Sequence, residues 1–474
     1  MTQKINNKKI ASNVIISIAV QGVSLIVSLL CSLLIPKVVG KSTYALWQTF
    51  MLYQSYVGIL HFGILDGILL RYSQYDYEEL DKARIRSQLR IMLAITSTAT
   101  LITSLVSFMS LGGDMRNVFI LIAFSIISKN LFTYASYTFQ ITNRIKKYAL
   151  LVLIQRGLYG VIIGFLLIFK VDNYLYFCLA EFAGDLTAIF VTSFMNKELY
   201  VGKGFSIRES ISEAKTNIGA GLMLLIANWS FIFIVGSARM VVDLRYDDVV
   251  FADVSFASSV SNMFLNFVTA VSVVLFPSLK RLKEEELPSV FDRLRRSMSL
   301  LLLFILVLYF PGEIILNLWL PNYADGVKYL GLLLPVIVYS SKVNLLTNNY
   351  LKVYRKEKAM ALVNSITIAV GLTAFLLCAY VFNDLTALLV SIVAVTMLNS
   401  LVAEIIVMRK ITKHDYLTII AEGLLSAVFI VSAVVVEGLK GAIIYLSAVT
   451  VYGAIVMIVR KRSGRADVDR REKD

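Results

Sequence analysis

The sequence predicts an all-α polytopic membrane protein with about 14 transmembrane helices, since about 14 apolar runs each reach the roughly 20 residues that cross a bilayer core. Three observations lead to this fold class. Hydrophobic residues make up 58% and charged residues 16% of the chain, and the mean hydropathy is +0.74. The apolar runs are continuous, which is typical of helices and not of the alternating strands of a membrane barrel. Almost every polar connector between them is short.

The predicted spans follow one another in tight pairs along the whole chain. They lie at 12–35, 45–70, 89–111, 117–140, 148–169, 174–195, 216–238, 250–277, 297–319, 327–350, 359–382, 386–408, 417–437 and 440–460. Glu404 and Glu422 interrupt two of the last apolar runs, so counts of twelve or thirteen crossings also stay open. The cysteines Cys31, Cys178 and Cys378 all fall inside spans, so no disulfide framework is expected.

The basic residues predict the orientation of these helices. If the N-terminus is cytoplasmic, the inner connectors and termini hold about 35 Lys and Arg and the outer connectors about 8, which is a strong positive-inside bias. The bias favours an even number of spans with both termini cytoplasmic. It also accounts for the net charge of +14 without a nucleic-acid partner, because the charge is spread over every inner turn.

The connector at 196–215 follows six spans and is the natural boundary between two bundles. We therefore predict two pseudo-symmetric six-helix bundles, at 1–213 and 214–410, a plan that recurs in transporters. Residues 411–460 would add two further helices. Residues 461–474 form a basic tail, expected to lie in the cytoplasm without a fixed structure.

Residues that indicate catalysis are scarce. The two histidines, His61 and His414, lie far apart, so a zinc site is not expected. Residues 40–43 (GKST) resemble the end of a phosphate-binding loop, but Ile35 stands where its first glycine would be. We expect no enzyme activity and no cofactor or metal, so any transport would be secondary, with H⁺ or Na⁺ as candidate coupling ions.

Three lone cations lie inside predicted spans: Lys129, Arg156 and Lys342. A charge at the bilayer centre costs about 2.5–3.5 kcal/mol on insertion scales, so such residues face a wet cavity or an opposite charge. An anionic ligand in a central lumen would explain all three. The alternatives are ion pairs that hold helices together and, for Arg156 and Lys342, extension of the side chain to the interface.

Polar amides also line predicted spans. The candidates for the lumen are Gln140, Asn262, Asn344 and Asn348, although such residues also serve as hydrogen bonds between helices. Glu181 and Asp185 are four residues apart and share one helical face. Two close carboxylates resist ionising together, so the pair is a candidate for proton or Na⁺ coupling. A static pairing with Lys129 or Arg156 is an equal alternative.

Several segments resemble the Wzx-type polysaccharide flippases of the MATE-like multidrug/oligosaccharidyl-lipid/polysaccharide (MOP) exporter superfamily. Residues 35–47 (IPKVVGKSTYALW) are similar to its Pro…Gly…Tyr-Gly-x-Trp stretch, and residues 62–72 (FGILDGILLRY) to its Phe-Gly…Gly…Arg-Tyr stretch. Residues 275–281 (LFPSLKR) resemble its Phe-Pro-x-Leu-x-Arg end of the eighth span. Two positions depart from the pattern: Ala45 replaces a glycine, and the acidic residue usual near the outer end of the seventh span is absent around Arg239.

The resemblance implies a V-shaped pair of bundles around a cationic lumen in the bacterial inner membrane. It implies a flippase that carries an oligosaccharide on polyprenyl pyrophosphate, for O-antigen, capsule or exopolysaccharide synthesis, beside a polymerase and chain-length proteins. In some relatives the two extra helices form a groove for the lipid tail. The alternatives are a cation-coupled drug exporter of the same fold and, less favoured because no long outer loop is present, a membrane polymerase or ligase.

Overall fold

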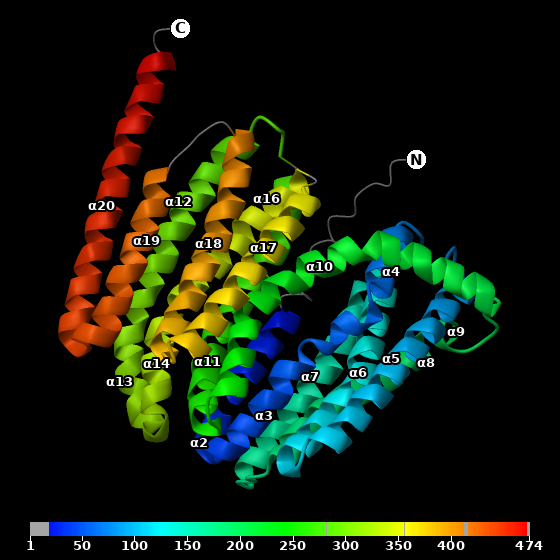
Figure 1. The fold of residues 1–474 in the computed structure, drawn as a ribbon. Coiled ribbons are helices and arrows are strands. Elements are labelled where there is room, and N and C mark those ends of the chain that lie inside the picture. Colours follow the sequence, from blue (N-terminus) through cyan, green and yellow to red (C-terminus); the bar gives the residue numbers. More distant parts are fainter. Residues whose placement is uncertain (1–18, 281, 355, 412–415, 472–474) are drawn as a thin grey trace.

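The structure, a computed structural model, describes residues 19–280, 282–354, 356–411 and 416–471. Helices and short connectors make up this part of the chain, without a strand (Figure 1). The first half begins with a helix over Ala19–Val38, which contains the π-turn η1 (Leu30–Leu34) and α2 (Ile35–Val38). It continues with α3 (Lys41–Gln54), η2 (Val57–His61), α4 (Ile64–Tyr72), α5 (Lys82–Ser110), α6 (Gly113–Ile141), α7 (Ile145–Ile168), α8 (Tyr174–Met195) and α9 (Lys197–Tyr200).

The second half begins with the long helix α10 (Ile207–Arg245). It continues with α11 (Asp248–Lys280), α12 (Leu287–Ile305), η3 (Leu306–Leu308), α13 (Tyr309–Trp319), η4 (Pro321–Tyr323), α14 (Ala324–Leu333), α15 (Pro335–Lys342), η5 (Val343–Thr347), α16 (Asn348–Val353), α17 (Glu357–Leu376), η6 (Leu377–Val381) and α18 (Leu385–Ile411). The chain then adds α19 (Tyr416–Val431), η7 (Ser432–Val436) and α20 (Gly438–Arg471).

The predicted all-helical membrane architecture is confirmed. Within the described residues, 10 helices are long and apolar enough to cross a membrane, and up to 11 if the pair Pro321–Leu333 and Pro335–Val353, bent by 42°, is one span. Three further predicted spans lie on α3–η2–α4, α10 and α11. The predicted count of 14 is compatible with this arrangement.

The predicted span 45–70 is not one straight helix. The chain leaves the right-handed region at Phe62 (φ 50°) and Gly63 (φ 85°), which separates η2 from α4. Left-handed backbone is open to glycine and costly for other residues. The break lets α4 press backbone to backbone on α10: a Cβ on Gly67 would lie 2.0 Å from the Asn217 carbonyl oxygen, and one on Gly221 would lie 2.2 Å from that of Gly63.

Helix α10 joins the two halves. It begins at a capping box formed by Ser206 and Glu209 and packs on α4 and α5 of the first half and on α11, α17 and α18 of the second (Figure 1). Arg71 of α4 forms an ion pair with Glu213 of α10 at 2.5 Å. The boundary placed at 213/214 from the sequence therefore falls inside one continuous helix.

The two terminal helices pack on the second half, where α19 and α20 both contact α12. Helix α20 continues to Arg471. The expectation that the basic tail has no fixed structure is therefore wrong for residues 461–471, where the polar segment extends the preceding apolar helix through Gly464.

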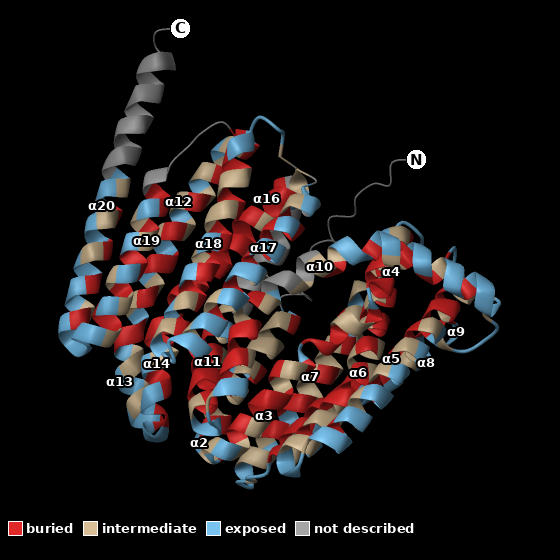
Figure 2. Cartoon of the chain, viewed as in Figure 1, coloured by how far each residue is buried: buried red, intermediate tan, exposed pale blue. Residues whose placement is uncertain are grey.

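Burial follows the faces of the helices. Buried residues concentrate where helices face one another, and exposed residues follow the outer faces (Figure 2). Large hydrophobic side chains are among the exposed ones: Leu318 is 79% exposed and Ile168 is 74% exposed. Such a surface suits hydrocarbon and not water as its solvent.

Candidate functional site

The two halves meet along a set of contacts between the η1–α2–α3 segment and α10, α11 and α13, which we call the seam. Lys41 Nζ lies 2.7 Å from Asp253 Oδ2 on α11, and Thr49 donates to Asp243 of α10 at 2.8 Å. The Trp319 indole donates to the Leu33 carbonyl at 3.3 Å. Under the predicted topology the seam lies on the outer side.

A cavity of about 630 Å³ lies beside the seam, between the two halves. Residues of α3, α7, α10, α11, α15 and η5 line it, so the first and second halves both contribute to its wall. The polar and charged lining residues are Ser28, Ser32, Gln48, Ser55, Tyr56, Arg156, Tyr159, Arg239, Ser259, Asn262, Ser340 and Asn344.

Arg239 is the first of two cations in this wall. Its side chain is buried, with 9% of the residue exposed. One guanidinium nitrogen, Nη2, donates to Gln48 Oε1 and to Ser255 Oγ, both at 3.0 Å, and the buried Nε has no partner among the described residues. Gln48 is held in turn by Tyr44 and Ser259, to whose hydroxyls its amide donates at 3.0 and 3.3 Å. The hydrogen-bond partners of this arginine are thus neutral, Asp243 acts on it electrostatically from farther away, and its Nε donor is not used.

Arg156 of α7 is the second cation. It lines the same cavity, partly buried, and forms no hydrogen bond or ion pair with a described residue. The neighbouring Tyr159 hydroxyl accepts a hydrogen bond from the Cys31 thiol at 3.6 Å, so Cys31 also faces this space.

The cavity wall lacks carboxylates. Among the described lining residues there is no Asp or Glu, and the segments 227–231 and 266–278, whose side chains are largely outside the description, contain neither in the sequence. Two arginines in a wall whose described residues include no carboxylate make the cavity suited to an anion, for which a guanidinium offers paired donors.

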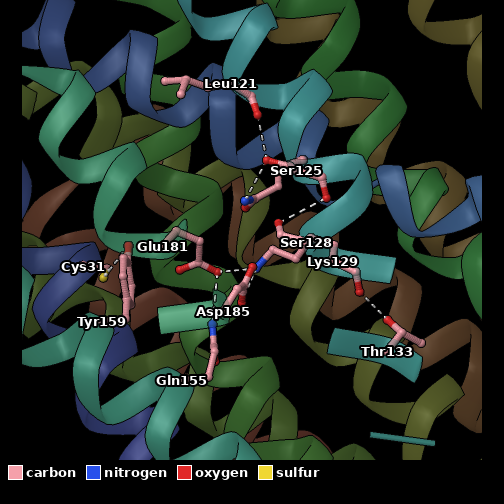
Figure 3. A network of polar contacts seen from close by, with 11 residues as sticks. Cys31, Leu121, Ser125, Ser128, Lys129, Thr133, Gln155, Tyr159, Glu181 and Asp185 are labelled. Carbon is pink, nitrogen blue, oxygen red and sulfur yellow. Dashed lines mark hydrogen bonds and ion pairs between the residues drawn. The ribbon is translucent and has the colours of Figure 1, made fainter. Parts of the chain in front are cut away.

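Lys129 does not line this cavity. Its Nζ lies inside the first half, 2.6 Å from Glu181 Oε1 and 2.8 Å from Asp185 Oδ2 (Figure 3). Gln155 of α7 also donates to Glu181 Oε1, at 3.3 Å. The geometry therefore matches the pairing alternative, with α6 joined to α8. Two carboxylates share one lysine here at ion-pair distance, and the Arg156 guanidinium acts on both of them electrostatically from farther away.

Lys342 does not line the cavity either. Its Nζ lies 2.7 Å from Glu404 Oε2 of α18 and 2.5 Å from Glu422 Oε2 of α19, and Glu404 also pairs with Arg295 of α12. All four side chains are buried, and two cations balance two anions. The two halves thus share one arrangement when the predicted spans are counted within each half. A lysine of the fourth span, Lys129 or Lys342, pairs with a carboxylate of the sixth span, Glu181 or Glu404. In the second half the cluster also includes residues of α12 and α19.

Of the four polar amides predicted to line the lumen, two line the cavity and two do not. Asn262 and Asn344 line the cavity. Gln140 donates to Ser136 on its own helix at 3.0 Å, and Asn348 lies outside the lining residues. Within the described part of the chain no group of three metal-ligating side chains comes together.

Arg239 is the residue that the sequence reasoning missed. The predicted span 216–238 ended one residue before it, which placed it in an outer connector. The structure continues α10 to Arg245, because 239–245 contains no glycine or proline and the charge finds polar partners. One signal in the sequence could have pointed to Arg239. The resembled family usually has an acidic residue at this place, and this chain has a basic one instead.

No protein-family model matches the chain, and no curated protein matches it. Solved structures match its fold. The lipid II flippase MurJ in an inward closed conformation superposes with a TM-score of 0.67 at 11% identity, over 94% of this chain and 100% of MurJ. An inward-facing multidrug resistance MATE family transporter gives 0.62 at 14% identity, over 84% of this chain and 98% of that one.

A third match is a MOP superfamily transporter from Pyrococcus furiosus, described as having a binding pocket of reversed polarity. It gives a TM-score of 0.53 at 12% identity, over 84% of this chain and 94% of that one. The chain therefore has the fold of the MOP superfamily transporters, in a multi-pass membrane protein.

Proposed function

We propose that this protein is a flippase that moves an oligosaccharide linked to a polyprenyl pyrophosphate across the bacterial inner membrane, for the synthesis of a surface polysaccharide. The head group would occupy the cavity between the two halves, and the lipid would stay in the bilayer. Rocking of the halves about the seam would expose the cavity to each side in turn.

The observation that carries this proposal is the charge of the cavity. Arg156 and Arg239 face it without an accompanying carboxylate among the described lining residues. A pyrophosphate is a dense anion whose oxygens accept the paired donors of a guanidinium. The serines, Gln48 and Asn262 supply the neutral hydrogen-bonding groups that sugar hydroxyls need.

The second candidate is a cation-coupled drug exporter, because MATE transporters share this fold. A cavity for cationic drugs would need acidic groups, and the described wall has none. A polymerase or ligase is less well supported, since the described lining residues include no acid–base pair. The inner membrane, the cytoplasmic termini and the partnership with a polymerase and chain-length proteins belong to the same proposal.

A thiol protection experiment tests the anion site. In a Cys378→Ser background, Cys31 is the cysteine that lines the cavity, whereas Cys178 is buried. Inorganic pyrophosphate should slow alkylation of Cys31 in the purified protein. Each charged hydrogen bond contributes about 1.5–3 kcal/mol, so Arg156→Ala and Arg239→Ala should weaken protection roughly 10- to 100-fold. Lys replacements should lose less.

The matched control is Arg116→Ala, which removes an equal charge from the first turn of α6, outside the cavity lining, and should leave protection unchanged. In cells, the two Ala variants should also lose surface polysaccharide at equal protein level. Protection by organic cations in place of pyrophosphate would contradict the flippase and favour the exporter.

A further inference from the structure

A second cavity adjoins the arginine cavity. It has a volume of about 220 Å³ and is lined by α11, the α12–η3–α13 segment, α14 and α15 of the second half and by Leu33 of the first. Met263 lines both cavities, so they lie on either side of the same side chain.

The wall of this second cavity is apolar. Tyr309, the one polar side chain among the described lining residues, donates its hydroxyl to the Val327 carbonyl at 3.3 Å and so presents its ring and not a free polar group. The other lining residues are Leu33, Val260, Met263, Phe264, Ile305, Leu306, Leu308, Gly312, Ile315, Leu316, Leu330, Leu334 and Ile337. Such a wall excludes ions and sugars and accepts hydrocarbon.

The cavity also reaches the outer face of the helices. Leu308 is 59% exposed and Ile315 is 64% exposed, although both line it. Gly312, between them, leaves open space, because a Cβ there would meet no atom within 4 Å. A lipid chain in the bilayer could therefore enter the apolar cavity beside Gly312.

We propose that this apolar cavity binds the first isoprene units of the substrate's polyprenyl chain while the pyrophosphate binds at Arg156 and Arg239. The proposal rests on the proposed function and adds the position of the lipid. An apolar cavity of about 150 Å³ is enough for benzene, so 220 Å³ holds at least one five-carbon unit. The path differs from a groove made by the two terminal helices, since neither α19 nor α20 lines the cavity.

The arrangement gives the substrate two unlike contacts on either side of Met263. A head group without the chain would meet only the arginine cavity, and a lipid without the anion would meet only the apolar one. Both cavities have walls that include residues of each half, since Leu33 of the first half lines the apolar cavity together with residues of the second. Rocking of the halves would therefore widen or narrow the entrances of the two cavities together.

The test compares pyrophosphates of increasing chain length, namely inorganic, isopentenyl, geranyl and farnesyl pyrophosphate. Binding to the full-length protein in lipid nanodiscs is measured by protection of Cys31, in the Cys378→Ser background. In the parent protein, affinity should rise at least tenfold from inorganic to farnesyl pyrophosphate. Gly312→Trp should reduce that rise to less than twofold and leave inorganic pyrophosphate binding unchanged.

Gly164→Trp is the matched control, since a Cβ at Gly164 on α7 also meets no atom within 4 Å, away from this cavity. It should keep the full rise. Gly312→Leu fills less space and should give a partial loss, which provides a second variant if the tryptophan protein does not fold.

Two results would overturn the proposal. One is that affinity does not rise with the length of the isoprenoid chain, or that it rises equally in the Gly312→Trp variant. The other is an equal gain for straight-chain dodecyl phosphate, which would assign the cavity to bulk lipid. Failure of inorganic pyrophosphate to bind the parent protein at all would instead refute the proposed function, so the two failures are distinguishable.

Discussion

Lys41 and Asp253 join the two halves of the protein through an ion pair of 2.7 Å between the first residue of α3 and the second turn of α11. Asp253 is buried, and the Lys41 ammonium also lies 5.0 Å from the centre of the Tyr323 ring. Loss of one partner leaves the other charge partly desolvated, so this contact stabilises the conformation in which the seam is closed.

Lys41→Ala should therefore open the seam more often. A charged hydrogen bond contributes about 1.5 kcal/mol at the lower end of its range, which is roughly tenfold in the open population. We expect Cys31 to react about tenfold faster with an impermeant maleimide added on the seam side. The control is Lys328→Ala, which breaks an exposed pair with Glu437 at 3.2 Å within the second half and should leave the rate unchanged.

Gly67→Ala and Gly221→Ala should both disrupt the packing of α4 on α10. Each new methyl group would meet a backbone carbonyl oxygen of the other helix, at 2.0 and 2.2 Å respectively. Overpacking costs about 1–3 kcal/mol where side chains can move, and backbone moves less readily. Gly219→Ala, which meets no atom within 4 Å on the same helix, should be neutral or stabilising by up to about 1 kcal/mol. Thermal unfolding in detergent distinguishes the three.

Arg156 and Lys342 should behave as opposites, although both are lone cations in predicted spans. Lys342→Ala leaves Glu404 and Glu422 buried with Arg295 as their one ion-pair partner among the described residues, and breaking a buried pair costs about 3–5 kcal/mol. Arg156→Ala removes no ion pair, so its stability should change by less than about 1 kcal/mol while pyrophosphate protection is lost. Equal destabilisation by the two would contradict this division.

This contrast also shows what the sequence can predict. Long apolar runs are set by local composition, so the all-helical membrane architecture follows from the sequence, and the predicted count of about 14 is compatible with the structure. Whether a cation in a span faces a cavity or a carboxylate depends on how helices far apart in the chain are rotated against each other. Lys342 finds Glu404 and Glu422 from 62 and 80 residues away, and periodicity within one span contains no information on that pairing.

Arg239 illustrates the other limit. The end of a predicted span is uncertain by two to four residues, and one residue moved Arg239 from an outer connector into the cavity wall. The break at Phe62 and Gly63 was likewise hidden, because a single left-handed pair interrupts an apolar run that otherwise continues. Local composition therefore predicts which residues are apolar better than it predicts where a helix bends.

The predicted topology can be measured directly. Reporter fusions after residue 242 should read outside and fusions after residue 285 inside, because the basic residues lie about 35 to 8 in favour of the inner connectors. These positions flank α11, so one helix separates the two expected signals. The reverse pattern would invert the seam and the direction proposed for transport.

Energy coupling gives the last prediction. Glu181 and Asp185 share Lys129, whereas Glu404 and Glu422 share Lys342 and Arg295. In the first cluster one cation lies within ion-pair distance of two carboxylates, with Arg156 farther away, whereas in the second two cations pair with two carboxylates. The first is therefore the site that would gain more from a proton or Na⁺. We propose that it loads such an ion as the cavity alternates. In vesicles with imposed gradients, Glu181→Gln with Asp185→Asn should abolish the gradient response of flipping. Glu404→Gln should lower stability and keep that response. If flipping ignores both gradients, or if the double variant still responds, the three residues only hold α6 against α8.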